Sequence, residues 1–257
     1  MNHFIVASQA VANLLTQNQL SSFEQIWESE LPWFEPPNHR RNGWSGVSKH
    51  QLHTPSGNHI NIFIKRQENH NTFSFHHPIA GIPTFSREFN NLKRLYHIGI
   101  GVPQPLLYAE RNHCGNKQAV LITKALDGYC SLESWYQRYP KATFTIREKL
   151  LGSLAACLRT FHNHHLVHNC LYPKHIFVTN AENPEHFQVC LIDLEKTKRV
   201  FNAKKRCHHD LQRFIRHADI MPEPDIQCFM ERYQLVDSRS TTFVQVKSIQ
   251  TTEAVTL

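Results

Sequence analysis

The sequence predicts an α+β fold of two lobes, in which a β-rich lobe holding one helix precedes a reduced helical lobe. Strand-like patterns dominate up to about residue 125, and helical patterns dominate from Leu126 onward. The chain has 257 residues, of which 40% are hydrophobic and 19% charged. Such a composition is that of an ordinary globular protein, and the length is sufficient for one well-buried domain or one domain of two lobes.

Four segments follow from these patterns. We expect an N-terminal arm over residues 1–22, a first lobe over 23–125, a second lobe over 126–237 and a poorly ordered tail over 238–257. The arm has an apolar face but no capping signal, so a marginal helix and a loose segment are both open. The tail is rich in Ser, Thr and Val and has no helical period.

The first lobe is predicted from three strands and one helix. Residues 59–65 alternate between polar and apolar side chains until they end in consecutive apolar residues and a lysine, and 105–109 and 119–123 are short buried strands. The segment 87–95 is helical, and Gly99, Gly101 and Pro103 end it. Its apolar stripe is made by Phe85, Phe89, Leu92 and Leu95.

The second lobe begins with a long helix. Thr145 and Glu148 have the spacing of a capping box, in which each side chain bonds the backbone of the other residue. The apolar face of this helix is made by Leu150, Leu151, Leu154, Leu158 and Phe161. A pair of short strands is expected around 176–178 and 189–192, and another helix is expected to start at Asp210.

Charge and targeting signals restrict the partners and the compartment. The formal charge is +7, and 19 histidines add to it where they are protonated. This charge would suit a polyanionic partner, but a merely soluble basic protein explains it about equally well. No apolar run approaches the roughly 18 residues of a membrane span, and the N-terminus lacks the basic region of a signal peptide. The seven cysteines include no C-x-x-C pair. We therefore expect a cytoplasmic protein with reduced thiols.

Residues 168–178, followed by 191–195, have the layout of a protein-kinase catalytic loop and metal-binding strand. A kinase places Asp at the third position of the first run, where it accepts the proton of the acceptor hydroxyl. This chain has Cys170 there. A thiol with a pKa near 8.5 is mostly protonated at neutral pH, and a missing general base typically costs about 10²–10⁴ in rate. The layout therefore predicts the fold and leaves open whether phosphate is transferred.

Other positions of the same layout can be assigned. Asp193 follows a buried strand and would hold Mg²⁺, a cation that prefers oxygen ligands. His175 stands where a kinase has the Asn for a second metal ion, and a packed structural histidine is the alternative. Lys174 could neutralise the transferring phosphate, and Asp210 is the residue expected to anchor the catalytic loop by its backbone.

The first lobe supplies the nucleotide-binding candidates. Lys65 at the end of its strand would pair the α- and β-phosphates, with Glu88 on the following helix as its partner. Gly43 and Gly46 could form a short phosphate-covering hairpin, and an ordinary β-turn explains them equally well. The connection that includes Thr123 and Ala125 would offer backbone groups to adenine.

The chain resembles the lipopolysaccharide kinase family, the heptose and Kdo kinases of Gram-negative bacteria, and most closely its InaA-like branch. The runs that carry this resemblance are 35–47, 64–67 and 171–178, and it extends over roughly Trp33 to Tyr233. Leu194-Glu195 in place of the usual Phe-Gly also fits these kinases. His162, His164, His165 and His168 lack a second ligand type at zinc spacing, and no nucleic-acid motif is present.

The resemblance implies a protein-kinase-like fold that uses ATP and Mg²⁺ to phosphorylate a sugar hydroxyl, with the lipopolysaccharide core as an anionic glycolipid acceptor. Peripheral contact with the inner membrane is a further implication, and a nucleic-acid partner is not expected. The alternative is a pseudokinase that keeps the fold as an interaction or stress-response module. Lys65, Glu88 and Asp193 favour the kinase, whereas Cys170 and the sparse glycine loop favour the pseudokinase.

Overall fold

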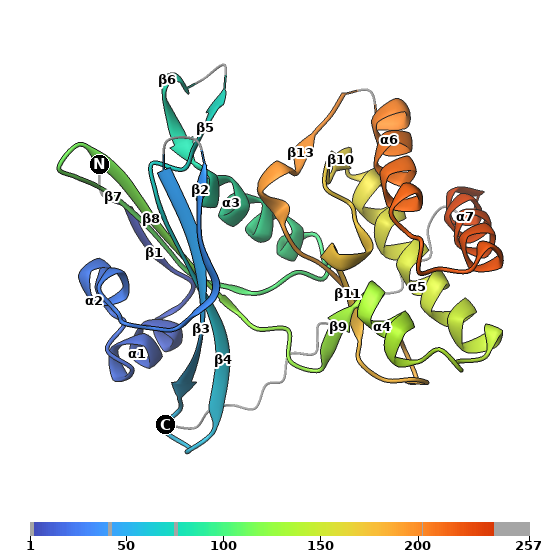
Figure 1. Cartoon of the computed structure of the whole chain (residues 1–257), viewed down its shortest axis with the longest axis horizontal. Helices are drawn as coiled ribbons and strands as arrows, with labels where there is room; N and C mark the ends of the chain where they lie inside the picture. The colour runs from blue at the N-terminus through green and yellow to red at the C-terminus, as the bar shows by residue number, and fades with distance from the viewer. Residues whose placement is uncertain (1–2, 41–42, 75–76, 202, 239–257) are drawn as a thin grey trace.

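The computed structural model describes residues 3–40, 43–74, 77–201 and 203–238, and it has two lobes (Figure 1). The first lobe is built on a six-stranded sheet with the order β1-β7-β8-β4-β3-β2, in which every neighbouring pair is antiparallel. The strands are β1 (His3–Val6), β2 (Trp33–Arg40), β3 (Gly43–His53), β4 (His59–Glu68), β7 (Pro105–His113) and β8 (Asn116–Lys124). All three predicted strands of this lobe are present.

Strand β4 is inside the sheet and determines which side chains face the second lobe. Its alternation puts Ile62 and Ile64, both fully buried, into a core on one face. Because successive side chains of a strand point to opposite faces, Lys65 lies on the other face. That face is covered by α3 (Thr84–His97) and is the side toward the second lobe (Figure 1).

The N-terminal segment is part of the sheet and not a separate arm, so that prediction needs correction. β1 pairs with β7, and α1 (Gln9–Gln17) and α2 (Phe23–Trp27) cover the outer face of the sheet (Figure 1). Ser8 caps α1 by accepting the Val11 amide at 3.3 Å, and Leu15 is only 1% exposed. The segment is ordered because its apolar side chains complete the core behind β4. The tail predicted after residue 238 lies outside the described residues.

Helix α3 confirms the predicted helix and extends it. The four residues of its apolar stripe are buried, and the chain leaves the helix at Ile98, followed by Gly99 with φ of +76°. Before α3, β5 (Asn71–Ser74) and β6 (His77–Pro83) form a separate hairpin. The apolar stripe therefore holds α3 against the sheet, and the same helix also reaches the second lobe.

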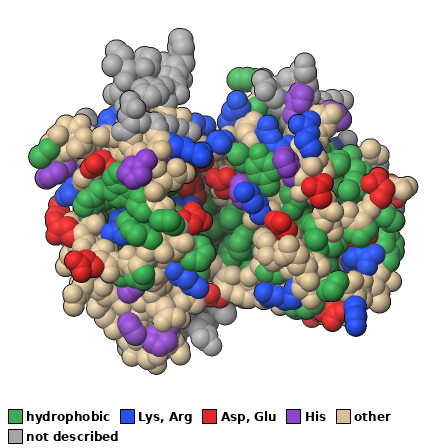
Figure 2. All heavy atoms as spheres, viewed as in Figure 1, with side chains coloured by type: hydrophobic (Ala, Val, Ile, Leu, Met, Phe, Trp, Pro, Cys, Tyr) green, Lys and Arg blue, Asp and Glu red, His purple; other side chains and the backbone are tan. Residues whose placement is uncertain are grey.

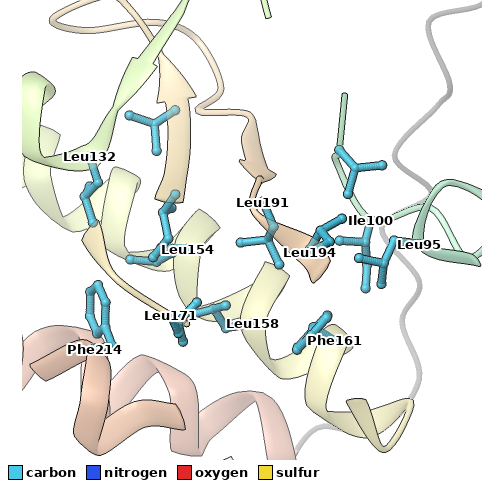
Figure 3. Packing of buried hydrophobic residues seen from close by; sticks show 14 of the residues in the cluster. Leu95, Ile100, Leu132, Leu154, Leu158, Phe161, Leu171, Leu191, Leu194 and Phe214 are labelled. Carbon is cyan, nitrogen blue, oxygen red and sulfur yellow. The ribbon is translucent and has the colours of Figure 1, made fainter. Parts of the chain in front are cut away.

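The second lobe is built around α5 (Phe144–Asn163), whose predicted apolar face is fully buried (Figure 3). The cap of α5 is Thr143, which accepts the Ile146 amide at 3.4 Å, and the capping box predicted at Thr145 is wrong because Thr145 already lies inside the helix. The remaining helical elements are α4 (Leu132–Arg138), η1 (Pro173–His175), η2 (Leu194–Lys196), α6 (Ala203–Arg216) and α7 (Glu223–Ser238). Asp210 lies in the middle of α6, so the helix begins seven residues before the predicted start.

Short strands of the second lobe carry the site. The predicted pair is confirmed as β11 (Ile176–Thr179) and β12 (Val189–Leu191), with Phe177 opposite Cys190. β9 (Tyr129–Ser131) extends this sheet on the other side of β11, and β10 (Leu166–Val167) pairs with β13 (Lys198–Arg199). The Leu191 amide also bonds the Gly101 carbonyl at 2.9 Å, which ties β12 to the first lobe. The predicted two-lobed α+β architecture is confirmed.

Candidate functional site

Lys65 and Glu88 form an ion pair between β4 and α3. The distance from Nζ to Oε1 is 2.5 Å, and the side chains are 23% and 8% exposed. Burial alone would lower the pKa of Lys65, but the charge and hydrogen bond of Glu88 outweigh it, and the charges of Asp193 and Glu35 add to the effect, so the pKa is raised. Lys65 is therefore a fixed cation paired with Glu88, the partner that the sequence predicted.

Asp193 follows β12 and is held in an unusual backbone conformation. Its φ and ψ are 58° and 54°, the left-handed region that non-glycine residues adopt only when their surroundings hold them there. The preceding amide, that of Ile192, donates to the His175 carbonyl at 3.0 Å. The carboxylate is 39% exposed, and its charge reaches Lys65. The predicted metal-binding carboxylate is thus near enough to the predicted lysine for its charge to act on it.

Asn91 connects the two lobes next to these residues. Its side-chain amide donates to the carbonyls of Leu194 at 2.8 Å and Thr197 at 2.9 Å, and the residue is only 6% exposed. Since Asn91 comes three residues after Glu88, both lie on neighbouring positions of one helix face. Helix α3 therefore holds the segment that follows Asp193 at the same time as it holds Lys65. Sequence patterns gave no signal for this residue.

Asp210 anchors the catalytic loop, as predicted. Its carboxylate accepts the His168 amide at 2.5 Å and the Asn169 amide at 2.9 Å, and it is 2% exposed. Burial alone would raise the pKa of Asp210, but the nearby imidazole of His162, with Nε2 3.6 Å from Oδ2, and the hydrogen bonds of these two amides outweigh it and hold the pKa below its usual range. The loop is thus fastened to α6 by an ionised carboxylate.

His168 joins the catalytic loop to the strand that carries Asp193. Its Nε2 donates to the Ile192 carbonyl at 2.9 Å, which leaves Nδ1 as the acceptor for the Cys170 amide at 3.3 Å. Burial lowers the pKa of this imidazole, although the charge of Asp210 acts in the opposite direction. The neutral ring therefore makes both bonds, and the histidine cluster considered for zinc is engaged in structure at this position.

Cys170 occupies the position of the missing general base and is 6% exposed. Burial and then the charge of Asp193 raise the pKa of the thiol, while Lys196 and Arg213 act against them. The thiol is therefore protonated at neutral pH and accepts a proton poorly. The preceding residue, Asn169, is held by its side chain, which donates to the Lys196 carbonyl at 2.9 Å, and by Arg213, which donates to its carbonyl.

His175 contacts both the catalytic loop and Asp193 through one ring nitrogen. Its Nδ1 lies 2.9 Å from the Cys170 carbonyl and 3.4 Å from Oδ2 of Asp193. A carbonyl oxygen can only accept, so Nδ1 carries the proton and has no lone pair for a metal ion. Nδ1 therefore connects Asp193 to the catalytic loop, and binding of a metal ion by His175, which would have to use Nε2, stays a prediction.

The donor set fits magnesium only if phosphate takes part. Among the described residues, no group of three or more His, Cys, Asp and Glu side chains could hold a metal ion. Mg²⁺ is commonly bound by one or two carboxylates together with substrate phosphates and water. Asp193 can supply the protein's carboxylate. Lys174 is exposed, with Nζ 5.9 Å from the centre of the Tyr172 ring, and its predicted role in transfer stays a prediction.

The two glycines of the predicted hairpin lie where two backbones or a ring come close. Gly43 pairs with Arg40 across the β2–β3 turn, and a Cβ there would lie 2.0 Å from the Glu68 carbonyl oxygen. A Cβ at Gly46 would lie 2.7 Å from the Trp33 ring. Packing thus requires both glycines, whatever they do for phosphate. The tip of the hairpin, residues 41–42, lies outside the described residues.

The connection between the lobes differs from the prediction at Ala125. Its amide donates to the Asn61 carbonyl at 2.8 Å because the β4–β8 ladder continues one residue past the strand, so this group is not free for adenine. Thr123 lies within the paired part of β8, opposite Phe63 and Pro105. The next amide, that of Leu126, belongs to the same predicted connection and makes no hydrogen bond within the described residues.

The comparisons with known proteins agree with this geometry. The model of the "Lipopolysaccharide kinase (Kdo/WaaP) family" matches residues 24–233. Protein InaA of Escherichia coli (strain K12) is 29% identical over 205 residues, which are 79% of this chain and 91% of that protein. The structure titled "WaaP in complex with acyl carrier protein" has a TM-score of 0.63 at 17% identity and covers 91% of this chain and 89% of its own.

The match to the family model covers most of the chain, including both lobes and every residue of the site described above. The structural likeness to WaaP identifies the two-lobed arrangement as a kinase-like fold. No described helix is long and apolar enough to cross a bilayer. Sequence and fold therefore lead to the same conclusion: this chain belongs to the lipopolysaccharide kinase (Kdo/WaaP) family.

Proposed function

We propose that this protein is an ATP-dependent kinase that phosphorylates a sugar hydroxyl of the lipopolysaccharide core. The observation that carries the proposal is the Lys65–Glu88 ion pair, which faces the cleft where the charge of Asp193 also acts. A lysine held by a glutamate beside a metal-binding aspartate is the arrangement that protein kinases use for the phosphates of ATP. Membership of the lipopolysaccharide kinase family supports the acceptor class.

Each residue has a defined task in this proposal. Lys65 would bind the α- and β-phosphates, and Glu88 would keep the ammonium group charged and in place. Asp193 would hold Mg²⁺, which when bound neutralises charge on the phosphate oxygens. The Leu126 amide would donate to the adenine ring. Gly43 and Gly46 would let the β2–β3 hairpin approach the phosphates, and Lys174 would add positive charge on the acceptor side.

Cys170 determines how fast such an enzyme could be. Its protonated thiol takes up little of the proton of the acceptor hydroxyl, so that contribution to the rate is largely lost. Phosphoryl transfer nevertheless has a loose transition state that depends mainly on positioning and electrostatic stabilisation. We therefore expect slow transfer, with proton loss late or to water. A peripheral contact of the protein with the inner membrane, where such a glycolipid is made available, belongs to this proposal.

A pseudokinase is the second candidate, and Cys170 is the observation that favours it. The two candidates differ in one measurable property, which is transfer of the γ-phosphate. The test is incorporation of labelled phosphate from γ-labelled ATP into purified lipopolysaccharide core, by the wild type and by Asp193→Ala. If the wild type incorporates more labelled phosphate than Asp193→Ala does, the kinase proposal is supported. Equal background for both proteins, with ATP bound, supports the pseudokinase.

A further inference from the structure

A polar cavity lies beside the catalytic loop, on the side of α6. Its volume is about 330 Å³, which is within the lower range of small-molecule sites. The cavity is lined by Asn169, His209, Asp210, Gln212, Arg213 and Arg216. Asn169 directly precedes Cys170 in the sequence, so one wall of the cavity belongs to the loop that carries Cys170. Lys, Arg and His side chains gather in this part of the second lobe (Figure 2).

The charge of the cavity is positive because two guanidinium groups outnumber its one carboxylate, whose oxygens are already bound. Each oxygen of Asp210 accepts a backbone amide of the catalytic loop. Arg213 donates one N–H to the Asn169 carbonyl, and a guanidinium has five N–H donors in all. Neither Arg213 nor Arg216 forms an ion pair with an acidic side chain in the part of the chain that the structure describes. Two guanidinium groups therefore line the cavity without a carboxylate partner.

The surroundings reinforce this charge. Lys196, Lys198 and Arg199 are exposed, and β13, which contains two of them, pairs with β10 at the side of α6. No described acidic side chain forms an ion pair with any of the three. Unneutralised cations around a polar cavity attract an anion, and guanidinium groups match the oxygens of phosphate and carboxylate in geometry.

A purely structural explanation covers only part of these observations. Arg213 and Arg216 are in the last turn of α6, where positive charge stabilises the helix dipole. The dipole does not require a cavity, however, nor the polar side chains of Gln212 and Asn169 in its wall. It also does not explain why Arg213 bonds the catalytic loop instead of the end of its own helix. The arrangement joins the cavity directly to the loop that carries Cys170.

We propose that this cavity binds an anionic substituent of the sugar acceptor, either a phosphate ester or a carboxylate. Arg216 is the specificity residue, and Arg213 joins the bound anion to the carbonyl of Asn169. The bound group would place the neighbouring hydroxyl at Cys170, so the enzyme would select acceptors that already carry a negative charge. This inference rests on the proposed kinase function.

The test measures binding of simple probes by isothermal titration calorimetry. Glucose 6-phosphate and glucuronate carry the two candidate anionic groups, and glucose is the neutral control. We expect at least one anionic probe to bind the wild type, with glucose much weaker and with affinity about tenfold or more lower in Arg216→Gln. Arg232→Gln, on α7, is the matched control and should bind as the wild type does. Far-UV circular dichroism confirms that both variants are folded.

Binding of Mg-ATP, measured on the same samples, separates the two proposals. ATP binding without binding of either anionic probe, or with equal probe binding by wild type and Arg216→Gln, overturns the cavity proposal and leaves the kinase proposal intact. Probe binding that Arg216→Gln weakens, in a protein that does not bind ATP, overturns the kinase proposal and supports an anion site. Preference for glucose 6-phosphate or for glucuronate identifies the anionic group.

Discussion

The side-chain amide of Asn91 donates to the backbone carbonyl of Leu194 at 2.8 Å, across the boundary between the lobes. The donor is on α3, three residues after Glu88, and the acceptor directly follows Asp193. One helix therefore fixes both the partner of Lys65 and the backbone that follows Asp193. This relationship supports the backbone next to Asp193, which is in a left-handed conformation.

Asn91→Ala should uncouple magnesium from nucleotide. Both carbonyl acceptors lose their partner, which at a buried position costs about 1–3 kcal/mol in the free energy of unfolding. We further expect the increase in ATP affinity caused by Mg²⁺ to fall severalfold, whereas ATP binding without Mg²⁺ changes little. Titrations of ATP with and without Mg²⁺ measure this difference.

The neighbouring Asn90 is exposed and supplies the control. Asn90→Ala should leave both affinities unchanged. If Asn91→Ala weakens ATP binding equally with and without Mg²⁺, the residue stabilises the protein but does not position Asp193.

Glu88→Gln should weaken ATP binding about tenfold while the protein stays folded. The amide can still accept a hydrogen bond from Lys65, but its charge is gone, so burial then dominates and lowers the pKa of Lys65. The ammonium group loses both its anchor and part of its charge at high pH. Isothermal titration of Mg-ATP at pH 7 and pH 9 measures the effect, which should be larger at pH 9.

Glu24 offers a comparison because it also forms an ion pair, with Arg111, on the far side of the sheet. Glu24→Gln should bind Mg-ATP as the wild type does. Equal weakening by both substitutions would contradict a specific role of Glu88.

Cys170→Asp should increase phosphate transfer by about 10²–10⁴, the usual contribution of a general base. The surroundings suit a carboxylate, since the charges of Lys196 and Arg213 already act on this position. Initial rates of transfer from ATP to the lipopolysaccharide core, at saturating acceptor, measure the change. Cys114→Asp, at an exposed thiol, is the control and should not alter the rate. An unchanged rate in Cys170→Asp would show that position 170 takes no proton in this enzyme.

Acidification should destabilise the protein through His168. Its pKa is lowered from 6.5 by burial, so the unfolded chain binds a proton that the folded imidazole does not. This contribution to stability is complete above pH 6.5 and is lost as the pH falls below that value. Asp210, with a lowered pKa, loses its contribution only below its ordinary value of 3.8. The urea midpoint should therefore decline between pH 7 and pH 5.

The variants His168→Gln and His186→Gln distinguish this histidine from the others. Glutamine can donate and accept without titrating, so His168→Gln should show a shallower decline, by about 1.4 kcal/mol for each unit by which the pKa of His168 differs between the folded and unfolded chain. His186 is exposed, and its replacement should leave the decline as it is. A decline of the same depth in both variants would assign the pH dependence to other groups.

Local sequence signals predicted those parts of the site that depend on chain order. The alternation of β4 puts Lys65 on the cleft face, and the apolar stripe of α3 turns Glu88 toward it. The run before Asp193 predicts a strand that ends at the cleft. These relationships are local in the sequence. The kinase-like layout of the motifs predicts that Lys65, Glu88 and Asp193 belong to one site.

The parts that could not be predicted depend on tertiary contacts. β1 pairs with β7 from about a hundred residues away, and Asn91 is one polar residue on an amphipathic helix until its partners in η2 are known. The role of His175 follows from which acceptor its Nδ1 meets, and the Ala125 amide is occupied because a strand ladder continues by one residue. Backbone hydrogen bonds of this kind leave no trace in residue types.

The central claim is that Lys65 and Asp193 form one nucleotide site, and the thermal stability of the protein with Mg-ATP tests it most directly. At a ligand concentration 100 times the Kd, binding adds about 2.7 kcal/mol, or roughly 5–10 °C in Tm for a chain of this size. We predict this increase for the wild type and for Lys49→Ala, an exposed control on β3, and its loss in Lys65→Ala and Asp193→Ala. A folded wild type whose Tm does not change with Mg-ATP would contradict the claim.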